Sequence, residues 1–191
     1  MLIAVLSGFL VALIAPAVCS VAREWSGWTL ALLPATLFAW FASQLPGVMA
    51  DGARVVTYPW FPALDIQLSF LIDGLSLMFA LLISGIGTFI LIYAGGYLKG
   101  HPAIARFYVV MLAFMASMLG VVLSDNLITL FVFWELTSIT SYLLIGFDHE
   151  DMTARRSALQ GLFVTVAGGL ALLAGLIMLW TITGSYALSG V

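Results

Sequence analysis

Long runs of apolar residues, separated by short polar stretches, dominate the pattern along this chain of 191 residues. A helix needs about 20 predominantly apolar residues to cross the hydrocarbon core of a bilayer. Runs of this kind predict transmembrane helices over residues 2–21, 25–45, 70–98, 104–123, 126–147 and 157–182. The pattern therefore predicts an all-α polytopic membrane protein, with about six transmembrane helices in a single transmembrane domain over residues 1–191.

The pattern changes between residues 46 and 69, where the hydrophobicity falls. Turn residues mark this stretch as a loop outside the membrane: Pro46, Gly47, Asp51, Gly52, Pro59 and Pro62. Residues 55–58 and 66–70 have the composition of strands, and the second run places apolar residues at every other position. We therefore expect a short β-hairpin that braces the neighbouring helix ends.

The composition supports a membrane protein and excludes several other classes. Hydrophobic residues make up 63% of the chain and charged residues 8%, with a mean hydropathy of +1.18. The first apolar run is not read as a secretory signal, because its first cation, Arg23, follows the run. No basic patch suggests nucleic acid, and the single Cys19 offers no metal-ligand spacing. Since no nucleophile elbow or phosphate loop occurs either, we expect no enzyme activity, cofactor or metal.

The distribution of cations predicts the orientation. If the N-terminus lies outside, five of the six Lys and Arg residues fall in inside turns and only Arg54 lies outside. This is the bias expected from the positive-inside rule. We therefore predict an extracytoplasmic N-terminus and an extracytoplasmic hairpin in a multi-pass protein of the cell membrane.

One carboxylic acid, Glu135, lies near the middle of the predicted helix over residues 126–147. At a helical rise of about 1.5 Å per residue, it lies roughly 13 Å from Asn126 and roughly 18 Å from Phe147. Placing such an acid in a bilayer costs at least ~2.5 kcal/mol, which makes it a candidate functional site. The alternative is structural: Glu135 could stay neutral and tie two helices together as a hydrogen-bond donor, since burial disfavours the charged form.

Hydroxyl side chains surround this acid on the same helix. Ser138 and Tyr142 share the helix face of Glu135, while Thr137 and Ser141 flank that face. A carboxyl that gains and loses a proton, extended by hydroxyls or water, is a simple intramembrane proton relay. Alternatively, each hydroxyl donates to a backbone carbonyl one turn earlier in its own helix.

Two further titratable residues are candidates for proton access, and each has a structural alternative. Asp73 lies near the outer interface, where we favour a role in capping neighbouring amides over proton handling. His149 lies in the acidic turn before the last helix, where a solvated residue is favoured over a proton port. In the same turn, Asp151 or Thr153 is placed to cap that helix.

No cation of the chain is a natural partner for Glu135. All six Lys and Arg residues lie at predicted helix ends or in loops, far from mid-membrane depth. An ionised carboxylate in this position needs a nearby cation to offset its desolvation. We therefore expect the counter-cation to come from helices beyond Val191 or from another subunit.

At this point several motifs point to a known family. The run SMLGVVLSDNLITLFVFWELTSITSYLLIGF from Ser117, the upstream run IDGLSLMFALLISGIGTFILIYAGGYL, and GGLALLAG and TITGS resemble the large A subunit of Mrp-type multisubunit sodium/proton antiporters. The wider family includes the antiporter-like subunits of complex I and of membrane-bound hydrogenases. By position, Glu135 is similar to the family's fifth-helix glutamate, which works with a lysine on a later, interrupted helix. Asp73 matches the acid of the DGLS motif.

The resemblance implies an N-terminal portion of the antiporter-like subunit fold, because family members have more helices than this chain. It implies a subunit of a monovalent cation/proton antiporter that moves H⁺ and Na⁺ (or K⁺/Li⁺). Its implied partners are membrane lipid, other antiporter subunits and the remaining helices of the A subunit. Two alternatives stay open: a proton-pumping subunit of a complex I-like or hydrogenase complex, and a membrane scaffold subunit that transports nothing.

Overall fold

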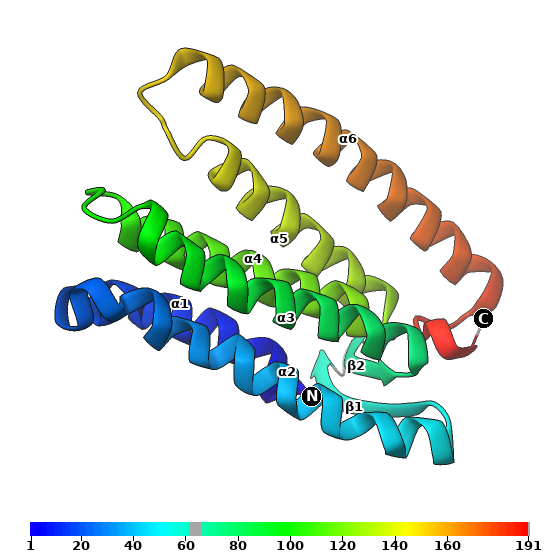
Figure 1. Cartoon of the computed structure of the whole chain (residues 1–191). Coiled ribbons are helices and arrows are strands. Elements are labelled where there is room, and N and C mark those ends of the chain that lie inside the picture. Colours follow the sequence, from blue (N-terminus) through cyan, green and yellow to red (C-terminus); the bar gives the residue numbers. More distant parts are fainter. Residues whose placement is uncertain (62–65, 191) are drawn as a thin grey trace.

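The computed structural model describes residues 1–61 and 66–190. Within these ranges, six α-helices accompany one two-stranded antiparallel sheet (Figure 1). The helices are α1 Leu2–Ala22, α2 Ser26–Asp51, α3 Gly74–Tyr97, α4 Ile104–Leu123, α5 Leu127–Ile145 and α6 Met152–Thr183; the strands are β1 Arg54–Phe61 and β2 Ile66–Ile72. The helical segments are long and apolar enough to cross a membrane. The predicted class, membrane helices with a small hairpin, is confirmed.

The first two helices form one nearly continuous helical run from Leu2 to Asp51, reversed at a three-residue 3₁₀ turn, η1 Arg23–Trp25. Arg23 makes the reversal with a φ of 46°, a conformation that L residues adopt rarely. The turns α1–α2, α3–α4 and α5–α6 lie at one end of the molecule, and the hairpin lies at the other end with both termini (Figure 1).

Helix α2 extends further than the sequence pattern suggested, so the expected loop over residues 46–69 begins too early. Pro46 lies inside α2, which continues to Asp51 and ends where Gly52, with a φ of 78°, donates its N–H to the carbonyl of Val48. A proline removes one helical hydrogen bond without forcing the helix to stop, and transmembrane helices tolerate it. The boundary is therefore set by Gly52 rather than by Pro46.

The hairpin is also longer than expected. Arg54 pairs with Ile72 and Val55 with Leu71, so β2 occupies residues that the sequence pattern assigned to the start of the third helix. The turn residue Pro62 lies outside the described residues. The hairpin contacts the start of α5: Asp125 N–H donates to the Ser69 carbonyl at 2.9 Å. This contact supports the expected bracing role.

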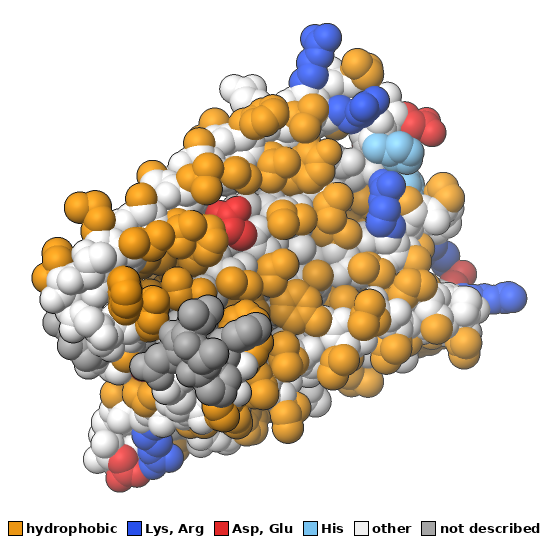
Figure 2. All heavy atoms as spheres, turned by 180° about the vertical axis from the view of Figure 1, so that it is seen from behind, with side chains coloured by type: hydrophobic (Ala, Val, Ile, Leu, Met, Phe, Trp, Pro, Cys, Tyr) orange, Lys and Arg blue, Asp and Glu red, His pale blue; other side chains and the backbone are white. Residues whose placement is uncertain are grey.

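The buried core lies among α1 to α4, whereas α6 lies at the edge of the molecule (Figure 1). In the most apolar 18-residue stretch of each helix, half of the residues of α4 are buried, but only 6% of those of α6. Hydrophobic side chains cover much of the outer surface between two ends that carry basic side chains (Figure 2). The molecule thus presents the apolar belt that a membrane protein needs.

Candidate functional site

Helix α5 packs between α4 and α6, and Glu135 lies on the side of α5 that faces α6. The residue is half-buried, and its Oε1 atom is buried. Among the described residues, Oε1 is the one buried side-chain nitrogen or oxygen without a hydrogen-bond partner. Leaving such a group unpaired costs about 1–3 kcal/mol, and more when it is charged. In the structural alternative, Glu135 ties two helices together by a hydrogen bond. Among the described residues, Oε1 has no partner for such a bond.

The Glu135 carboxyl lies against the backbone of α6 at Gly169. A Cβ atom at Gly169 would overlap Oε1 and lie 3.1 Å from the carboxyl carbon. Gly169 is buried, one of two buried residues among the described residues of α6. The sequence analysis did not single out Gly169, and the usual signal of a packing seam, small residues at four-residue spacing, falls on Ala167, Ala171 and Gly175 instead. These three residues are exposed, whereas the adjacent Gly168-Gly169 pair was the available signal.

The hydroxyls near Glu135 divide into two groups. Thr137 Oγ1 donates to the Trp134 carbonyl at 2.6 Å, and Ser138 Oγ lies 3.4 Å from the same carbonyl. These two follow the back-bonding alternative, although each oxygen can still accept a proton. The side-chain hydroxyls of Ser141 and Tyr142 have no hydrogen-bond partner within the part of the chain that the structure describes. Each of the two is therefore free to bind water.

A cavity of about 270 Å³ opens at the α5–α6 turn and brings Tyr142 and His149 to one space. Its other lining residues come from α4, α5 and α6: Arg106, Val110, Leu143, Gly146, Arg155 and Ala158. The Arg106 guanidinium lies 3.4 Å from His149 Nδ1 and donates to the Phe147 carbonyl. The face of α5 that carries Glu135 therefore ends in a cavity whose lining includes two arginines and a histidine.

Asp73 caps a helix, as the sequence suggested. Its carboxylate accepts the backbone N–H of Ser76 at 2.7 Å, and Ser76 Oγ accepts the backbone N–H of Asp73 at 2.9 Å. This reciprocal capping box satisfies two donors at the start of α3. Asp151 caps α6 in a simpler way, accepting the Thr153 N–H at 2.8 Å. Both acids thus have a structural function that Glu135 lacks.

The buried acid Asp125 escaped the sequence analysis, which left it in the short gap between the predicted helices over residues 104–123 and 126–147. Asp125 is 1% exposed and accepts hydrogen bonds from Ser189 N–H at 2.8 Å and Ser189 Oγ at 2.9 Å. Its position between two long apolar runs, with no room for a solvated loop, was the available signal. Because its partners are present, Asp125 ties the C-terminal residues to the start of α5.

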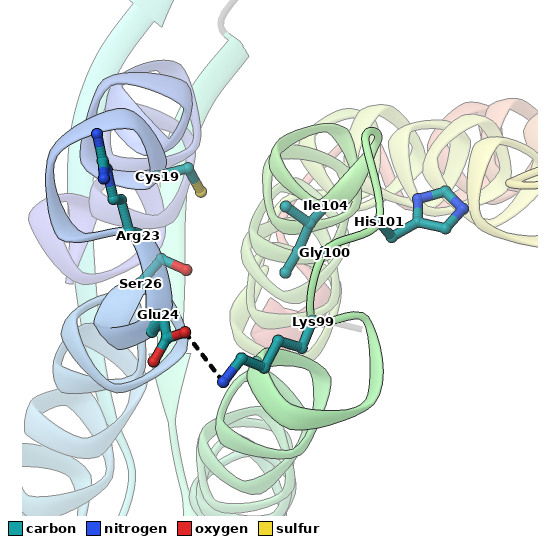
Figure 3. Close-up of a pocket in the computed structure, with 9 residues that line it drawn as sticks. Cys19, Arg23, Glu24, Ser26, Lys99, Gly100, His101 and Ile104 are labelled. Atoms are coloured by element: carbon teal, nitrogen blue, oxygen red, sulfur yellow. Dashed lines mark ion pairs between the residues drawn. The ribbon is translucent and has the colours of Figure 1, made fainter.

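The cations of the chain lie away from Glu135. Lys99 Nζ pairs with Glu24 Oε1 at 3.0 Å across a cavity of about 350 Å³ between the α1–α2 and α3–α4 turns (Figure 3). Both side chains are mostly exposed. At the opposite end, Arg54 pairs with Asp51. Among the described residues, no Lys or Arg forms an ion pair with Glu135.

Two family models match the chain. The model described as NADH-Ubiquinone oxidoreductase (complex I), chain 5 N-terminus matches residues 60–108. The model described as NADH:quinone oxidoreductase/Mrp antiporter, TM matches residues 124–191. The second match includes α5 and α6, and with them the contact between Glu135 and Gly169.

Individual relatives cover nearly all of this chain. The A subunit of the Na(+)/H(+) antiporter of Alkalihalophilus pseudofirmus is 43% identical over 190 residues, which are 98% of this chain and 24% of the relative. The putative antiporter protein mnhA2 of Staphylococcus haemolyticus is 43% identical over 168 residues, 87% of this chain and 21% of the relative. The chain therefore spans between a fifth and a quarter of the length of these curated relatives.

Solved structures contain the same fold. A chain in the structure of the Mrp complex from a Dietzia species matches 97% of this chain and 20% of its own length, with a TM-score of 0.84 and 32% identity. A chain of the membrane-bound sulfane sulfur reductase, an archaeal respiratory membrane complex, matches 98% of this chain and 28% of its own length, with a TM-score of 0.73 and 18% identity. At that identity the second match shows a shared fold alone.

Proposed function

The chain belongs to the NADH:quinone oxidoreductase/Mrp antiporter family, and we propose that it forms part of the A subunit of a multisubunit Na⁺/H⁺ antiporter. In this proposal it is a transporter component rather than an enzyme, and it contributes a proton path through Glu135. The observation that carries the proposal is the buried, unpaired Oε1 of Glu135 in the middle of a membrane helix. Its partners are the other antiporter subunits and the remaining helices of its own subunit.

Glu135 acts in this proposal as a site that binds and releases one proton. Burial among apolar groups without a counter-charge disfavours the charged form of any carboxyl group. The ionised form needs a cation close by, because a lone buried charge is strongly destabilising. We propose that a cation supplied by the rest of the assembly approaches Glu135 during transport, so that its approach favours proton release and its departure favours proton uptake.

The cavity at the α5–α6 turn is the proposed entrance to this site. His149 and Tyr142 line it, and Tyr142 lies on the Glu135 face, about 10 Å along the helix from the acid at 1.5 Å per residue. Protons would pass from the cavity to Glu135 through water held by Tyr142, Ser141 and Ser138. The Ser138 oxygen can accept a proton from such water although its own proton points to the Trp134 carbonyl.

We propose that the basic end of the molecule faces the cytoplasm of a cell whose plasma membrane holds the complex. The structure gathers the α1–α2, α3–α4 and α5–α6 turns, with five of the six cations, at one end. Single cysteines replacing Ala53 and Glu150, in a Cys19→Ser background, should react with an impermeant thiol reagent from outside and inside respectively. Reaction of Ala53→Cys only from the cytoplasmic side would reverse the proposed orientation.

The central test is a Glu135→Gln substitution in the assembled antiporter. Glutamine keeps the size and much of the hydrogen bonding of the side chain but cannot titrate, so exchange should fall to background while assembly is retained. Glu135→Asp should retain part of the activity, with a changed pH dependence. The measurement is the internal pH of vesicles after a sodium pulse. Wild-type exchange by Glu135→Gln would instead assign Glu135 a structural role in a scaffold.

A further inference from the structure

Helices α5 and α6 pack antiparallel along a short series of contacts. Near the turn, a Cβ atom at Gly146 would lie 3.3 Å from the Ala158 Cβ, and one at Gly161 would lie 3.8 Å from Ile145 Cδ1. Further along, the Glu135 carboxyl meets Gly169. Ala158 and Gly169 are the buried residues in the described part of α6. The contact at Glu135 is thus one of the two places where α6 is fully covered.

This contact differs from the others in what occupies it. At the turn end, a Cβ added at Gly146 or Gly161 would meet aliphatic side-chain atoms, whereas at Gly169 the polar carboxyl occupies the volume that a Cβ would fill. The adjacent Gly168 is exposed and has no atom within 4 Å of the position of a Cβ. Of these two neighbouring glycines of one helix, only the buried Gly169 makes room for Glu135.

We infer that Gly169 is a positioning residue that seats the Glu135 carboxyl against the backbone of α6. Without a side chain at residue 169, the carboxyl remains between α5 and α6, with Oε1 shielded from lipid. A methyl group at residue 169 is held in place by the helix backbone, and it would overlap the carboxyl of Glu135. The flexible carboxyl must therefore rotate out of this interface. The inference rests on the proposed function only where it concerns transport, since the placement of the carboxyl can be measured separately.

The test compares Gly169→Ala with Gly168→Ala in the assembled antiporter. Both changes replace a glycine in the same helix with the residue of highest helix propensity, so effects of propensity are matched. Gly169→Ala should lower the exchange rate at least tenfold and shift the pH at which exchange is half-maximal. Gly168→Ala should leave both within twofold of wild type. Equal behaviour of the two variants would overturn the inference.

A combination with Glu135→Asp separates positioning from general packing. The aspartate side chain is one methylene shorter than glutamate, so its carboxyl can fit between α5 and α6 beside the added methyl group. In the wild-type background Glu135→Asp should slow exchange, whereas in the Gly169→Ala background it should raise exchange, a non-additivity that a double-mutant cycle measures. If Gly169→Ala fails to assemble, the same second change should restore assembly. Failure of Glu135→Asp to restore either property would contradict the inference.

A readout that does not depend on transport distinguishes this inference from the proposed function. A hydrophobic carbodiimide modifies protonated carboxyls within membranes, and mass spectrometry quantifies its addition to Glu135. The rate of modification should change in Gly169→Ala and stay as in wild type in Gly168→Ala. If it does so while Glu135→Gln exchanges normally, the proposed function is wrong and the positioning stands. If Glu135→Gln abolishes exchange but Gly169→Ala changes neither modification nor pH profile, the positioning is wrong and the function stands.

Discussion

The body formed by α1 to α4 and the pair formed by α5 and α6 differ in one buried polar group. Within the body, hydroxyls donate to carbonyls of their own helix: Ser84 Oγ to Ala80 at 2.6 Å and Ser117 Oγ to Ala113 at 2.8 Å. In the pair, Glu135 Oε1 is buried without a partner among the described residues. These hydroxyls of the body thus find partners within their own helices, whereas Oε1 finds none among the described residues, and this is why the proposal assigns its partner to the rest of the assembly.

The same division is visible in the packing. Large side chains such as Tyr108, Leu112 and Leu119 are completely buried in the body. Along α6, by contrast, large apolar residues such as Phe163 and Val164 are exposed, at 71% and 67%. Apolar side chains can face lipid without cost, so this exposure alone does not indicate a protein partner. The body thus has a packed interior, whereas α6 contributes little buried surface.

The largest expected effect lies in the body, at Gly27. A Cβ atom there would lie 2.8 Å from the Leu91 carbonyl oxygen and 2.8 Å from the Tyr108 hydroxyl, so Gly27→Ala pushes α2 away from α3 and α4. Overpacking of this kind costs about 1–3 kcal/mol, and occasionally more. We expect reduced thermal stability and reduced recovery of the complex. The measurement is the unfolding temperature of the purified complex in detergent.

Gly96→Ala in α3 is the matched control, because a Cβ at that exposed position meets no atom within 4 Å. It should be neutral or slightly stabilising, since alanine favours a helix over glycine by about 0.5–1 kcal/mol. Equal stability of the two variants would break the comparison, since it would show that the body is not closely packed at Gly27.

The sequence was sufficient to predict what depends on local pattern. Apolar runs of membrane-spanning length gave the helical class, and alternation together with turn residues indicated the hairpin. An acid directly before an apolar run, as at Asp73, predicted a helix cap that the structure contains. The end of α2 was predicted wrongly because a proline was read as a stop, whereas the positive φ of Gly52 determines it.

The sequence could not predict what depends on pairing between helices. A four-residue spacing of small residues describes one helix only, and in α6 it falls on Ala167, Ala171 and Gly175, which are exposed. Gly169 is distinguished by the side chain that reaches it from α5, so the contact follows from the register of two antiparallel helices. The depth of Glu135, in contrast, follows from counting residues along one helix, and this is why the acid was found and its neighbour was missed.

An intermediate effect is expected at Asp73, where the same chemical change as Glu135→Gln can be made in the other region. Asp73→Asn keeps a capping oxygen and should preserve both stability and exchange, because asparagine caps about as well as aspartate. Asp73→Ala removes the acceptor for the Ser76 N–H and should cost about 1 kcal/mol of stability, with exchange retained. Unfolding temperatures and sodium-dependent exchange rates check this. Loss of exchange in an intact Asp73→Asn complex would assign proton handling to Asp73 as well.

The smallest effect is expected for the Lys99–Glu24 ion pair. The side chains are 62% and 69% exposed, so water solvates both charges whether or not they pair. Exposed ion pairs contribute about 0–1 kcal/mol, and added salt weakens them further. Glu24→Gln should therefore lower the unfolding temperature slightly at low salt and leave it unchanged at high salt. A large loss of stability that persists at high salt would show that the turns joining α1 to α2 and α3 to α4 depend on this pair. Charge pairing would then matter at the surface as the proposed function requires at Glu135, and depth in the membrane would no longer separate the two regions.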